Sequence, residues 1–383
     1  MHSPIRFITG LAAAATLTLA GTSAAFAAAP GVTGHVYVNA NTAGRNAVSG
    51  FERHADGSLT GIAGAPFATG GAGIGSPTGS AGALQRSADG RYLLAVDAAS
   101  DDISVLRIRP NGSLRLADVT SSNGHIPLSI AVHGDLVYVA NTGAGGSNYT
   151  GFRLNPGGQL RPIPNSTVAL PDDALPGQVL FSPDGRHLVG TRVGPNAGPS
   201  FIDSFAVGAD GRLSAAPGSP FAAQGVGPFG SQFRPTDSSQ LFVSNAHDGA
   251  GNGTVSVYDV AADGTLSPVS GSPFADLETA PCWVAISHDG SSLYAVNTGS
   301  SSISSFGIAR NGVLSLVGST PMRGTGLKAF DAAVDSTDSF LYVVDSGVAG
   351  VSAFGLDGTS VHELGSSPFA VPGGGSPFGI VVD

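Results

Sequence analysis

Charged residues are scarce in this sequence. Asp, Glu, Lys and Arg make up 11% of its 383 residues, and the formal net charge is −10. Lysine occurs once, as Lys328, and basic residues form no continuous run. Proteins that bind nucleic acid neutralise backbone phosphates with clustered Lys and Arg. A nucleic-acid partner is therefore not expected.

Cysteine and long apolar runs are equally rare. Cys282 is the only cysteine, so no internal disulfide can form and the fold depends on apolar burial and backbone pairing. One long apolar run follows Arg6, over residues 7–20, and precedes the small-residue stretch Ala25-Phe26-Ala27. This pattern predicts a secretory signal peptide over residues 1–27 and a mature domain over residues 28–383. The alternative is an uncleaved anchor, although the run is shorter than the about 20 residues that span a bilayer. We expect a secreted, periplasmic or cell-envelope protein without stable membrane insertion.

Several enzyme motifs are also absent. The sequence has no Gly-x-Ser-x-Gly, His-Glu-x-x-His, Gly-Lys-Ser/Thr or Cys-x-x-Cys-His pattern, and no cofactor is predicted. Asp97, Asp101 and Asp102 form an acidic group that leaves a bound cation open as an alternative. Asx side chains at strand ends usually bind their own backbone, so no metal site is predicted.

Glycine and proline are abundant instead, with 57 and 25 residues, beside 42% hydrophobic residues. Many short strands joined by tight turns give this combination, whereas a disordered chain would lack the apolar share. Residues 280–321 show one unit clearly, because Asp289-Gly290 and Asn311-Gly312 separate short apolar runs. Such pairs are the strongest short-range hairpin signal. They predict four antiparallel strands over residues 283–286, 292–296, 302–308 and 314–317.

The last turn of this unit recurs about every 50 residues along the chain. Its copies are Asp56-Gly57, Asn111-Gly112, Gly157-Gly158, Asp210-Gly211, Asp263-Gly264, Asn311-Gly312 and Asp357-Gly358. Asn or Asp ends the second strand in most units, and Arg192 interrupts this column. Proline begins the first strand in most units. A fixed period of this length with four strands per unit predicts an all-β, seven-bladed β-propeller.

The two ends of the chain predict how the ring closes. The mature chain begins at a second strand, residues 35–38, with no first strand before it. The C-terminus runs past the seventh unit into Ser376-Pro377-Phe378, which matches the start of other first strands, and then into residues 380–382. The C-terminal strand is therefore predicted to join blade one and to pair two edges that would otherwise stay open.

Loop lengths favour one face of the ring as the site. First-to-second and third-to-fourth turns are tight, whereas second-to-third loops and links between blades are longer and fall on the opposite face. Binding residues gather on variable loops held by a rigid frame. On this long-loop face we predict His125 and His247 as candidate bases and Arg192 and Arg323 as candidate carboxylate ligands. Solvated histidines and ordinary surface cations are the alternatives.

Near the ring axis, two residues depart from a column of mostly small side chains. The column lies two places after the proline that begins each first strand, and its departures are Trp283 and Asp331. Trp283 either packs between blades with Cys282 or contributes a ring to the floor of a pocket. Asp331 either satisfies backbone groups at a strand start or acts as a general acid or base with a tuned pKa.

Four motifs in the repeat resemble a known family. They are Ser-Pro-Asp-Gly-Arg-His-Leu at 182–188, Ala-Asp-Gly-Arg-Leu at 209–213, Ala-Asp-Gly-Thr-Leu at 262–266 and Ala-Pro-Cys-Trp-Val at 280–284. They are similar to the lactonase family of seven-bladed propellers, which includes bacterial 6-phosphogluconolactonases and fungal carboxymuconate cyclases. The resemblance extends from about residue 34 to residue 383. It implies opening or closing of a lactone ring at the channel mouth.

Two functional hypotheses follow, and the sequence leaves both open. In the first, the protein is an exported lactonase-like hydrolase in which His125, His247 or Asp331 activates water and Arg192 or Arg323 holds the substrate. In the second, it is a non-catalytic propeller that binds a glycan, peptide or envelope component through the long-loop face. The resemblance favours the first, and the scarcity of titratable side chains favours the second. In either case we expect a monomer with a small-molecule or envelope ligand.

Overall fold

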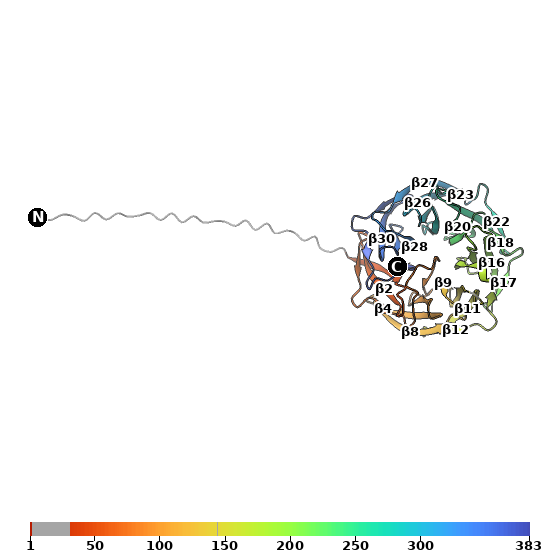
Figure 1. Ribbon diagram of the computed structural model, residues 1–383, viewed down its shortest axis with the longest axis horizontal. Coiled ribbons are helices and arrows are strands. Elements are labelled where there is room, and N and C mark those ends of the chain that lie inside the picture. Colours follow the sequence, from red (N-terminus) through yellow and green to blue (C-terminus); the bar gives the residue numbers. More distant parts are fainter. Residues whose placement is uncertain (2–30, 144) are drawn as a thin grey trace.

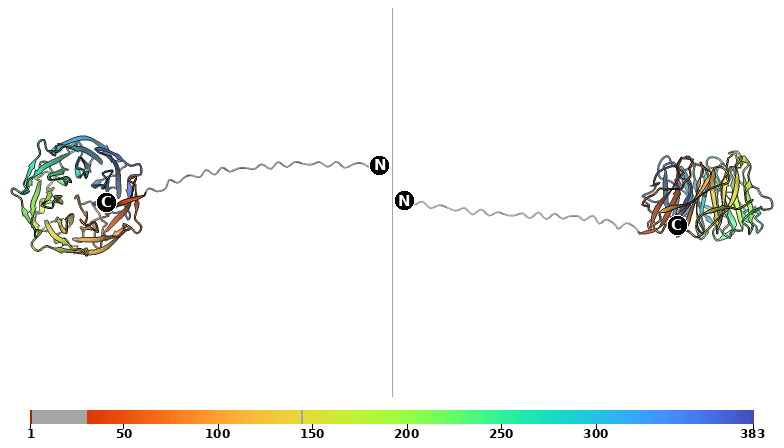
Figure 2. Two further views of the ribbon diagram at one scale, coloured as in Figure 1. Left: turned by 180° about the vertical axis from the view of Figure 1, so that it is seen from behind. Right: turned by 90° about the horizontal axis from the view of Figure 1, so that it is seen from below.

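The computed structural model describes residue 1, residues 31–143 and residues 145–383, and the ring is formed by residues 31–383. The predicted signal peptide, residues 1–27, falls almost entirely outside the described residues. Within them, seven antiparallel sheets surround a central axis as the blades of a propeller (Figure 1). Seen from the side, the ring is a flat disc (Figure 2). The predicted fold class is confirmed.

Each blade contributes one strand to the axis, and these innermost strands contact one another around the ring. From blade 1 to blade 7 they are β33 (Ile380–Val382), β5 (Leu84–Arg86), β9 (Pro127–His133), β14 (Pro176–Phe181), β19 (Pro228–Arg234), β24 (Pro281–Ile286) and β28 (Ala329–Val334). The second strands are β1 (Val32–Asn39), β6 (Tyr92–Asp97), β10 (Leu136–Asn141), β15 (His187–Arg192), β20 (Asp237–Asn245), β25 (Ser292–Asn297) and β29 (Phe340–Asp345).

The third strands are β2 (Ala47–His54), β7 (Asp102–Ile108), β11 (Asn148–Leu154), β16 (Phe201–Val207), β21 (Thr254–Val260), β26 (Ser302–Ile308) and β30 (Gly350–Asp357). The outer strands are β3 (Leu59–Gly61), β8 (Leu114–Ser121), β12 (Leu160–Pro162), β17 (Leu213–Ala215), β22 (Leu266–Pro268), β27 (Leu314–Pro321) and β31 (Ser360–Glu363). The strands predicted over residues 280–321 correspond to β24–β27.

The outer edge of most blades is divided into two short strands, which the sequence analysis missed. In five blades a second short strand also pairs with the third strand. These strands are β4 (Phe67–Ala68), β13 (Val168–Ala169), β18 (Phe221–Ala222), β23 (Phe274–Ala275) and β32 (Phe369–Ala370). A recurring Pro-Phe-Ala triplet precedes or forms four of them and was the available signal. A single turn of 3-10 helix, Asp172–Ala174, lies in the link from blade 3 to blade 4.

The ring closes as predicted. In blade 1, β33 pairs antiparallel with β1, with Val36 opposite Val382, Tyr37 opposite Val381 and Val38 opposite Ile380. The blue C-terminal strand and the red N-terminal strands therefore share one sheet (Figure 1). At the axis, a Cβ on Gly379 would lie 2.7 Å from the Leu84 amide nitrogen of blade 2, and this residue has a φ of +82°. Only glycine fits such close approach in that conformation.

The repeated Asp/Asn-Gly turn has a structural partner in the neighbouring blade. The hydroxyl of Tyr37 donates to the Gly112 carbonyl, Tyr138 to Gly211, Tyr294 to Gly358 and Tyr342 to Gly57. Each tyrosine lies on a second strand, and each acceptor belongs to the third-to-fourth turn of the next blade. The turn that defines the repeat therefore also binds each blade to its neighbour.

Candidate functional site

Two cavities lie along the central channel. The axial cavity has a volume of about 330 Å³ and is lined by innermost strands of six blades together with Arg86 and His288, which precede tight turns. It therefore reaches the tight-turn face. The long-loop pocket has a volume of about 280 Å³ and lies at the other end of the channel. It is lined by Thr78, Gly79, Leu128, Thr142, Leu175, Pro176, Val193, Gly194, Asn196, Phe229 and His247.

An aromatic layer separates these two cavities. Trp283 lines the axial cavity and Phe229 lines the long-loop pocket, and their ring centroids are 6.4 Å apart. Phe330 packs edge-on against Trp283 at 5.0 Å. Trp283 is 1% exposed and belongs to the same apolar cluster as Cys282. Trp283 therefore packs in the core between blades. Its ring also closes the deep end of the axial cavity.

The link from blade 1 to blade 2 crosses the long-loop end of the channel. The backbone N–H of Ala81 donates to the Gly177 carbonyl of blade 4, and the Ser80 hydroxyl donates to the Leu128 carbonyl of blade 3. These bonds hold Thr78 and Gly79 over the pocket. A site on this face is thus covered by a segment that belongs to a distant blade.

His247 enters the long-loop pocket from the loop between β20 and β21. Its ring packs edge-on against Phe229, with centroids 5.4 Å apart. Its Nδ1 is buried and has no hydrogen-bond partner among the described residues. Burial lowers the pKa of His247, although the nearby Asp248 carboxylate opposes this shift. The imidazole is therefore neutral at pH 7 and keeps a free nitrogen. The Oγ1 atom of Thr78, in the same pocket, is likewise buried and unpartnered in the described chain.

His125 lies elsewhere on the same face. Its Nδ1 is 2.9 Å from the Asp101 carboxylate, and the side chain is 59% exposed. Asp101 also accepts the backbone N–H of Ile126. His125 is not among the residues that line the long-loop pocket. The structure therefore does not bring the two predicted histidines into one cavity.

Asp331 lies at the deep end of the axial cavity rather than on the loop face. Its carboxylate accepts the backbone N–H groups of Gly82 and Ala332 at 2.9 Å each, and that of Ile380. Burial raises its pKa to about 6, and these three hydrogen bonds oppose the shift. The arrangement joins the innermost strands of blades 7, 1 and 2. Asp331 and His247 line different cavities.

Arg192 and Arg323, which were predicted to bind a substrate carboxylate, both form ion pairs within the protein. Arg192 contacts both oxygens of Asp203, which also accepts the Tyr149 hydroxyl at 3.0 Å. Asp203 stands two places beyond the residue paired with Arg192, where other blades carry Ser104, Thr150, Ser256 or Ser304. In those blades Asn or Asp ends the second strand and faces a Ser or Thr. In blade 4 the Arg192–Asp203 ion pair takes the place of this neutral or singly charged pair.

Arg323 is bound to the end of the outer strand β31. Its backbone N–H and side chain both contact the Glu363 carboxylate, and its guanidinium donates to the carbonyls of Glu363 and Leu364. The acidic group next to blade 2 is also dispersed, because Asp97 is buried against Asn46, Thr69 and Ser104. In the parts of the chain that the structure describes, no three His, Cys, Asp or Glu side chains could hold a metal ion.

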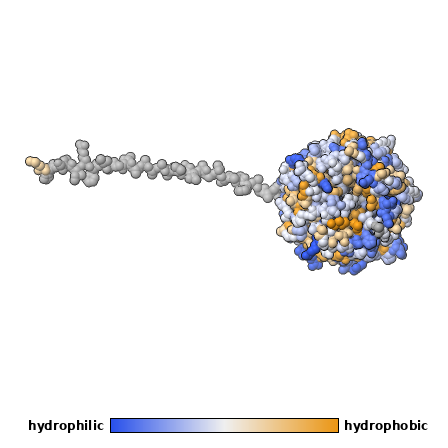
Figure 3. Space-filling model, in the orientation of Figure 1, coloured by the Kyte–Doolittle hydropathy of each residue, from blue (hydrophilic) through white to orange (hydrophobic). Residues whose placement is uncertain are grey.

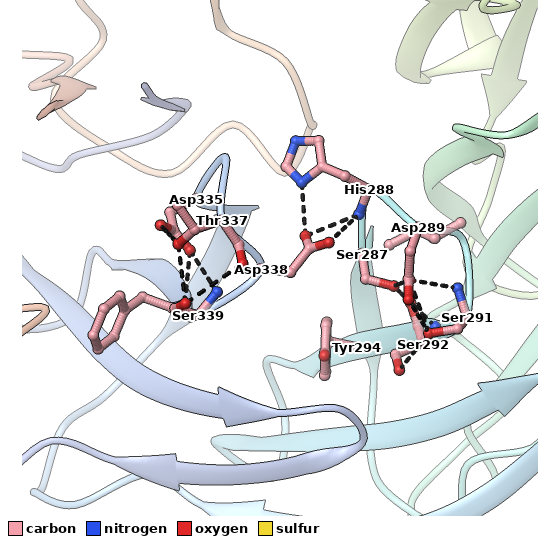
Figure 4. Close-up of polar contacts among 12 residues, drawn as sticks. Ser287, His288, Asp289, Ser291, Ser292, Tyr294, Asp335, Thr337, Asp338 and Ser339 are labelled. Carbon is pink, nitrogen blue, oxygen red and sulfur yellow. Dashed lines mark hydrogen bonds and ion pairs between the residues drawn. The ribbon is translucent and has the colours of Figure 1, made fainter. Parts of the chain in front are cut away.

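The axial cavity has a polar lining that was not predicted from the sequence. Gln85, Gln178 and Gln232 project from β5, β14 and β19, and Ser231 lies between them. At the mouth, the imidazole of His288 stands over Asp338, with 2.7 Å between Nδ1 and the carboxylate (Figure 4). Gln178 occupies the column that singled out Trp283 and Asp331, and its size in a column of small residues was the signal.

Comparison with known proteins agrees with the ring and its repeat. The sequence matches the model of a family described as "Lactonase, 7-bladed beta-propeller" over residues 35–171 and 171–375. The chain belongs to the lactonase family. No curated protein matches it. The resemblance inferred from the turn motifs is thus confirmed for family and fold.

Solved structures similar to this lactonase-family propeller share its fold at low identity. A candidate 6-phosphogluconolactonase from Bacteroides fragilis is 20% identical with a TM-score of 0.71, covering 91% of this chain and 98% of its own. A second, from Bacteroides uniformis, is 20% identical with a TM-score of 0.70, covering 91% and 99%. The periplasmic gluconolactonase of Pseudomonas aeruginosa is 18% identical with a TM-score of 0.71, covering 91% and 98%. Among the described residues no helix is long and apolar enough to cross a membrane.

Proposed function

We propose that the protein is a lactonase-type hydrolase that opens a small, uncharged lactone in the long-loop pocket, with His247 as general base. One observation carries this proposal: Nδ1 of His247 and Oγ1 of Thr78 line the same pocket, and both are buried without a partner in the described chain. Buried polar groups normally have hydrogen-bond partners. A substrate and its attacking water can supply them. Membership of the lactonase family supports the reaction type.

The chemistry needs one base and one donor. A water oxygen attacks the lactone carbonyl carbon while the neutral imidazole of His247 takes the water proton. The hydroxyl of Thr78 donates to the carbonyl oxygen as negative charge develops there. When the ring C–O bond breaks, the imidazolium returns its proton to the departing alkoxide. The product is the open hydroxy acid, and the imidazole is neutral again.

The lining of the pocket favours a substrate without charge. None of its lining residues is Asp, Glu, Lys or Arg. Arg192 lies near it but is bound to Asp203 through both carboxylate oxygens. A phosphate group entering this pocket would be desolvated without a cation to pair with, which is costly. We therefore favour an unphosphorylated lactone over a sugar phosphate.

A panel of lactones tests the proposal. With purified protein, at least one uncharged lactone should be hydrolysed, and His247→Gln should lower kcat/KM by about 100-fold or more while the melting temperature stays constant. Thr78→Val should lower kcat without a matching change in KM. His362→Gln, on the exposed outer strand β31, serves as the matched control. His125→Ala reports whether the second histidine participates.

The non-catalytic alternative predicts a different result in the same assays. In that case no lactone is turned over, and a glycan, peptide or other envelope component binds saturably to the long-loop face. Binding that weakens in His247→Gln without any hydrolysis by the parent protein would replace the hydrolase proposal.

We also propose that the protein is exported after cleavage behind Ala27. The apolar run and the Ala25-Phe26-Ala27 stretch support this, as does the fold shared with a periplasmic gluconolactonase. N-terminal sequencing of protein recovered from the cell envelope or medium should begin at Ala28. An intact Met1 in the exported fraction would contradict cleavage.

A further inference from the structure

The axial cavity holds hydrogen-bonding groups that the proposed hydrolysis does not use. It opens at the tight-turn face, on the other side of the Phe229–Trp283 layer from the long-loop pocket. Its volume of about 330 Å³ lies at the small end of the range for small-molecule sites, about 300–1,000 Å³. A ligand here would therefore not occupy the same space as a substrate bound at His247.

Two glutamines in this cavity have their orientation set by the backbone. Oε1 of Gln178 accepts the N–H and the hydroxyl of Ser231, and Oε1 of Gln232 accepts the Ile286 N–H at 2.9 Å. A backbone N–H can only donate, so the amide oxygen must face it. The Nε2 groups of Gln178 and Gln232 therefore point away from these N–H groups, and neither has a hydrogen-bond partner among the described residues.

The free amide groups of these glutamines belong to residues that line the axial cavity. Gln178 is 8% exposed and lines the cavity, so its NH₂ group is available to a ligand there and has no protein acceptor. Gln85 adds a third amide from β5, and its side chain likewise has no partner in the described chain. The cavity therefore offers several donors to a ligand rich in oxygen.

The charges around the cavity are largely compensated. At its mouth, Arg86 lies 3.8 Å from the Asp383 carboxylate, and His288 is bound to Asp338 (Figure 4). At its deep end, the Asp331 carboxylate accepts backbone N–H groups and is not paired with a cation. At the deep end an anionic ligand would approach the Asp331 carboxylate, while Arg86 and His288, which also line the cavity, are already paired with carboxylates. A neutral ligand avoids that repulsion.

We propose that the axial cavity is a binding site for a neutral, hydroxyl-rich small molecule of monosaccharide size, either a sugar or a polyol. Its hydroxyl oxygens accept from Nε2 of Gln178 and Gln232. Its hydroxyl groups can donate hydrogen bonds to oxygen atoms at the deep end, beside Asp331. Trp283 supplies an apolar surface at the same end. This site is distinct from the long-loop pocket.

Titration with glucose, glucitol and gluconate, followed by calorimetry or NMR, tests the site. We expect saturable binding of glucose or glucitol, and weaker binding of gluconate. Gln178→Glu and Gln232→Glu keep the oxygen that accepts the backbone N–H but replace the free donor, so each should weaken binding about tenfold or more. Gln159→Glu is the matched control, because Gln159 is exposed on the outer edge and also has an accepting Oε1.

The result is decisive in each direction. Neutral-ligand binding that weakens in either glutamate variant, with normal unfolding, and persists in Gln159→Glu and in His247→Gln, supports the axial site. Absence of binding by every neutral probe overturns it. Tighter binding of gluconate than of glucose, or glucose binding that is lost only in His247→Gln, overturns it as well.

Discussion

The Asp331 carboxylate accepts a hydrogen bond from the backbone N–H of Gly82, which lies 249 residues earlier in the chain, at 2.9 Å. The same carboxylate accepts N–H groups from Ala332 and from Ile380 of the closing strand β33. One side chain thus joins blade 7, where it originates, to blades 1 and 2 on the far side of the closure. This is a fold-stabilising role for a residue that also lines a cavity.

Asp331→Asn should therefore destabilise the ring. An amide can present only one oxygen to the three N–H groups, and its own NH₂ group would face a donor, so we expect a loss of about 3 kcal/mol in the free energy of unfolding. Urea unfolding of the variant measures this. A catalytic carboxylate would instead show a large fall in kcat at unchanged stability, and that outcome would return Asp331 to the reaction.

Removal of residues 376–383 should abolish cooperative unfolding. The deletion takes away β33, exposes the edge of β1 and removes Phe378, which is 1% exposed. It also removes the Ile380 N–H that donates to the Asp331 carboxylate and the Asp383 carbonyl that accepts from Arg53. Deletion of Asp383 alone keeps β33 and should cost much less. A melt of the longer deletion that matches the parent protein would refute ring closure by this strand.

The repeat anchors were enough to predict the fold because they report local turn chemistry. Asp-Gly and Asn-Gly pairs, the prolines that begin first strands and the polar residues that end second strands each act within one blade. The site depends on contacts between blades, which one sequence does not display. The sequence shows Gln178 only as a large residue in a column of small ones, and the orientation of its amide is set by Ser231 of the next blade. His247 gains its environment from Phe229 and from the Thr78 segment of a distant link. Arg192 looked free because its partner, Asp203, lies on another strand.

Replacement of Arg192 by alanine should lower stability by about 3 kcal/mol. Asp203 is 1% exposed, so loss of the guanidinium leaves a buried carboxylate with only the Tyr149 hydroxyl. The double variant Arg192→Asn with Asp203→Ser recreates the pair found in other blades, where Asn297 binds Ser304, and should recover most of this loss. Urea midpoints of the parent protein and of these two variants measure it. An increase in KM without any change in stability would indicate substrate binding by Arg192 instead.

Asp276 should make the protein less stable as pH rises from 4 to 6. Both carboxylate oxygens are buried, and this burial raises the pKa of Asp276 to about 6, although the nearby Ser304 hydroxyl opposes the shift. Because the folded pKa exceeds the unfolded value of 3.8, the unfolded carboxyl loses its proton first and the folded state loses stability until pH exceeds 6.

Asp276→Asn removes this titration. At pH 7 the variant should be more stable than the parent by about 2 kcal/mol, and at pH 4 the two should unfold alike. Asp259→Asn, at an exposed position on β21, is the control. A stability gain that is equal at both pH values would show that charge burial at Asp276 is not its cause.

The pH dependence of lactone hydrolysis should follow the neutral form of His247. Burial lowers the pKa of this imidazole below its usual 6.5, so the base stays deprotonated at pH 7 and becomes protonated only at lower pH. We expect kcat/KM to be constant between about pH 7 and 8 and to fall on the acid side through a pKa below 6.5. Residual hydrolysis by His247→Gln should lack that acid limb. An acid limb of the same position in both proteins would assign the titrating base to another residue, and His125→Ala would then identify whether the Asp101-bound imidazole carries it.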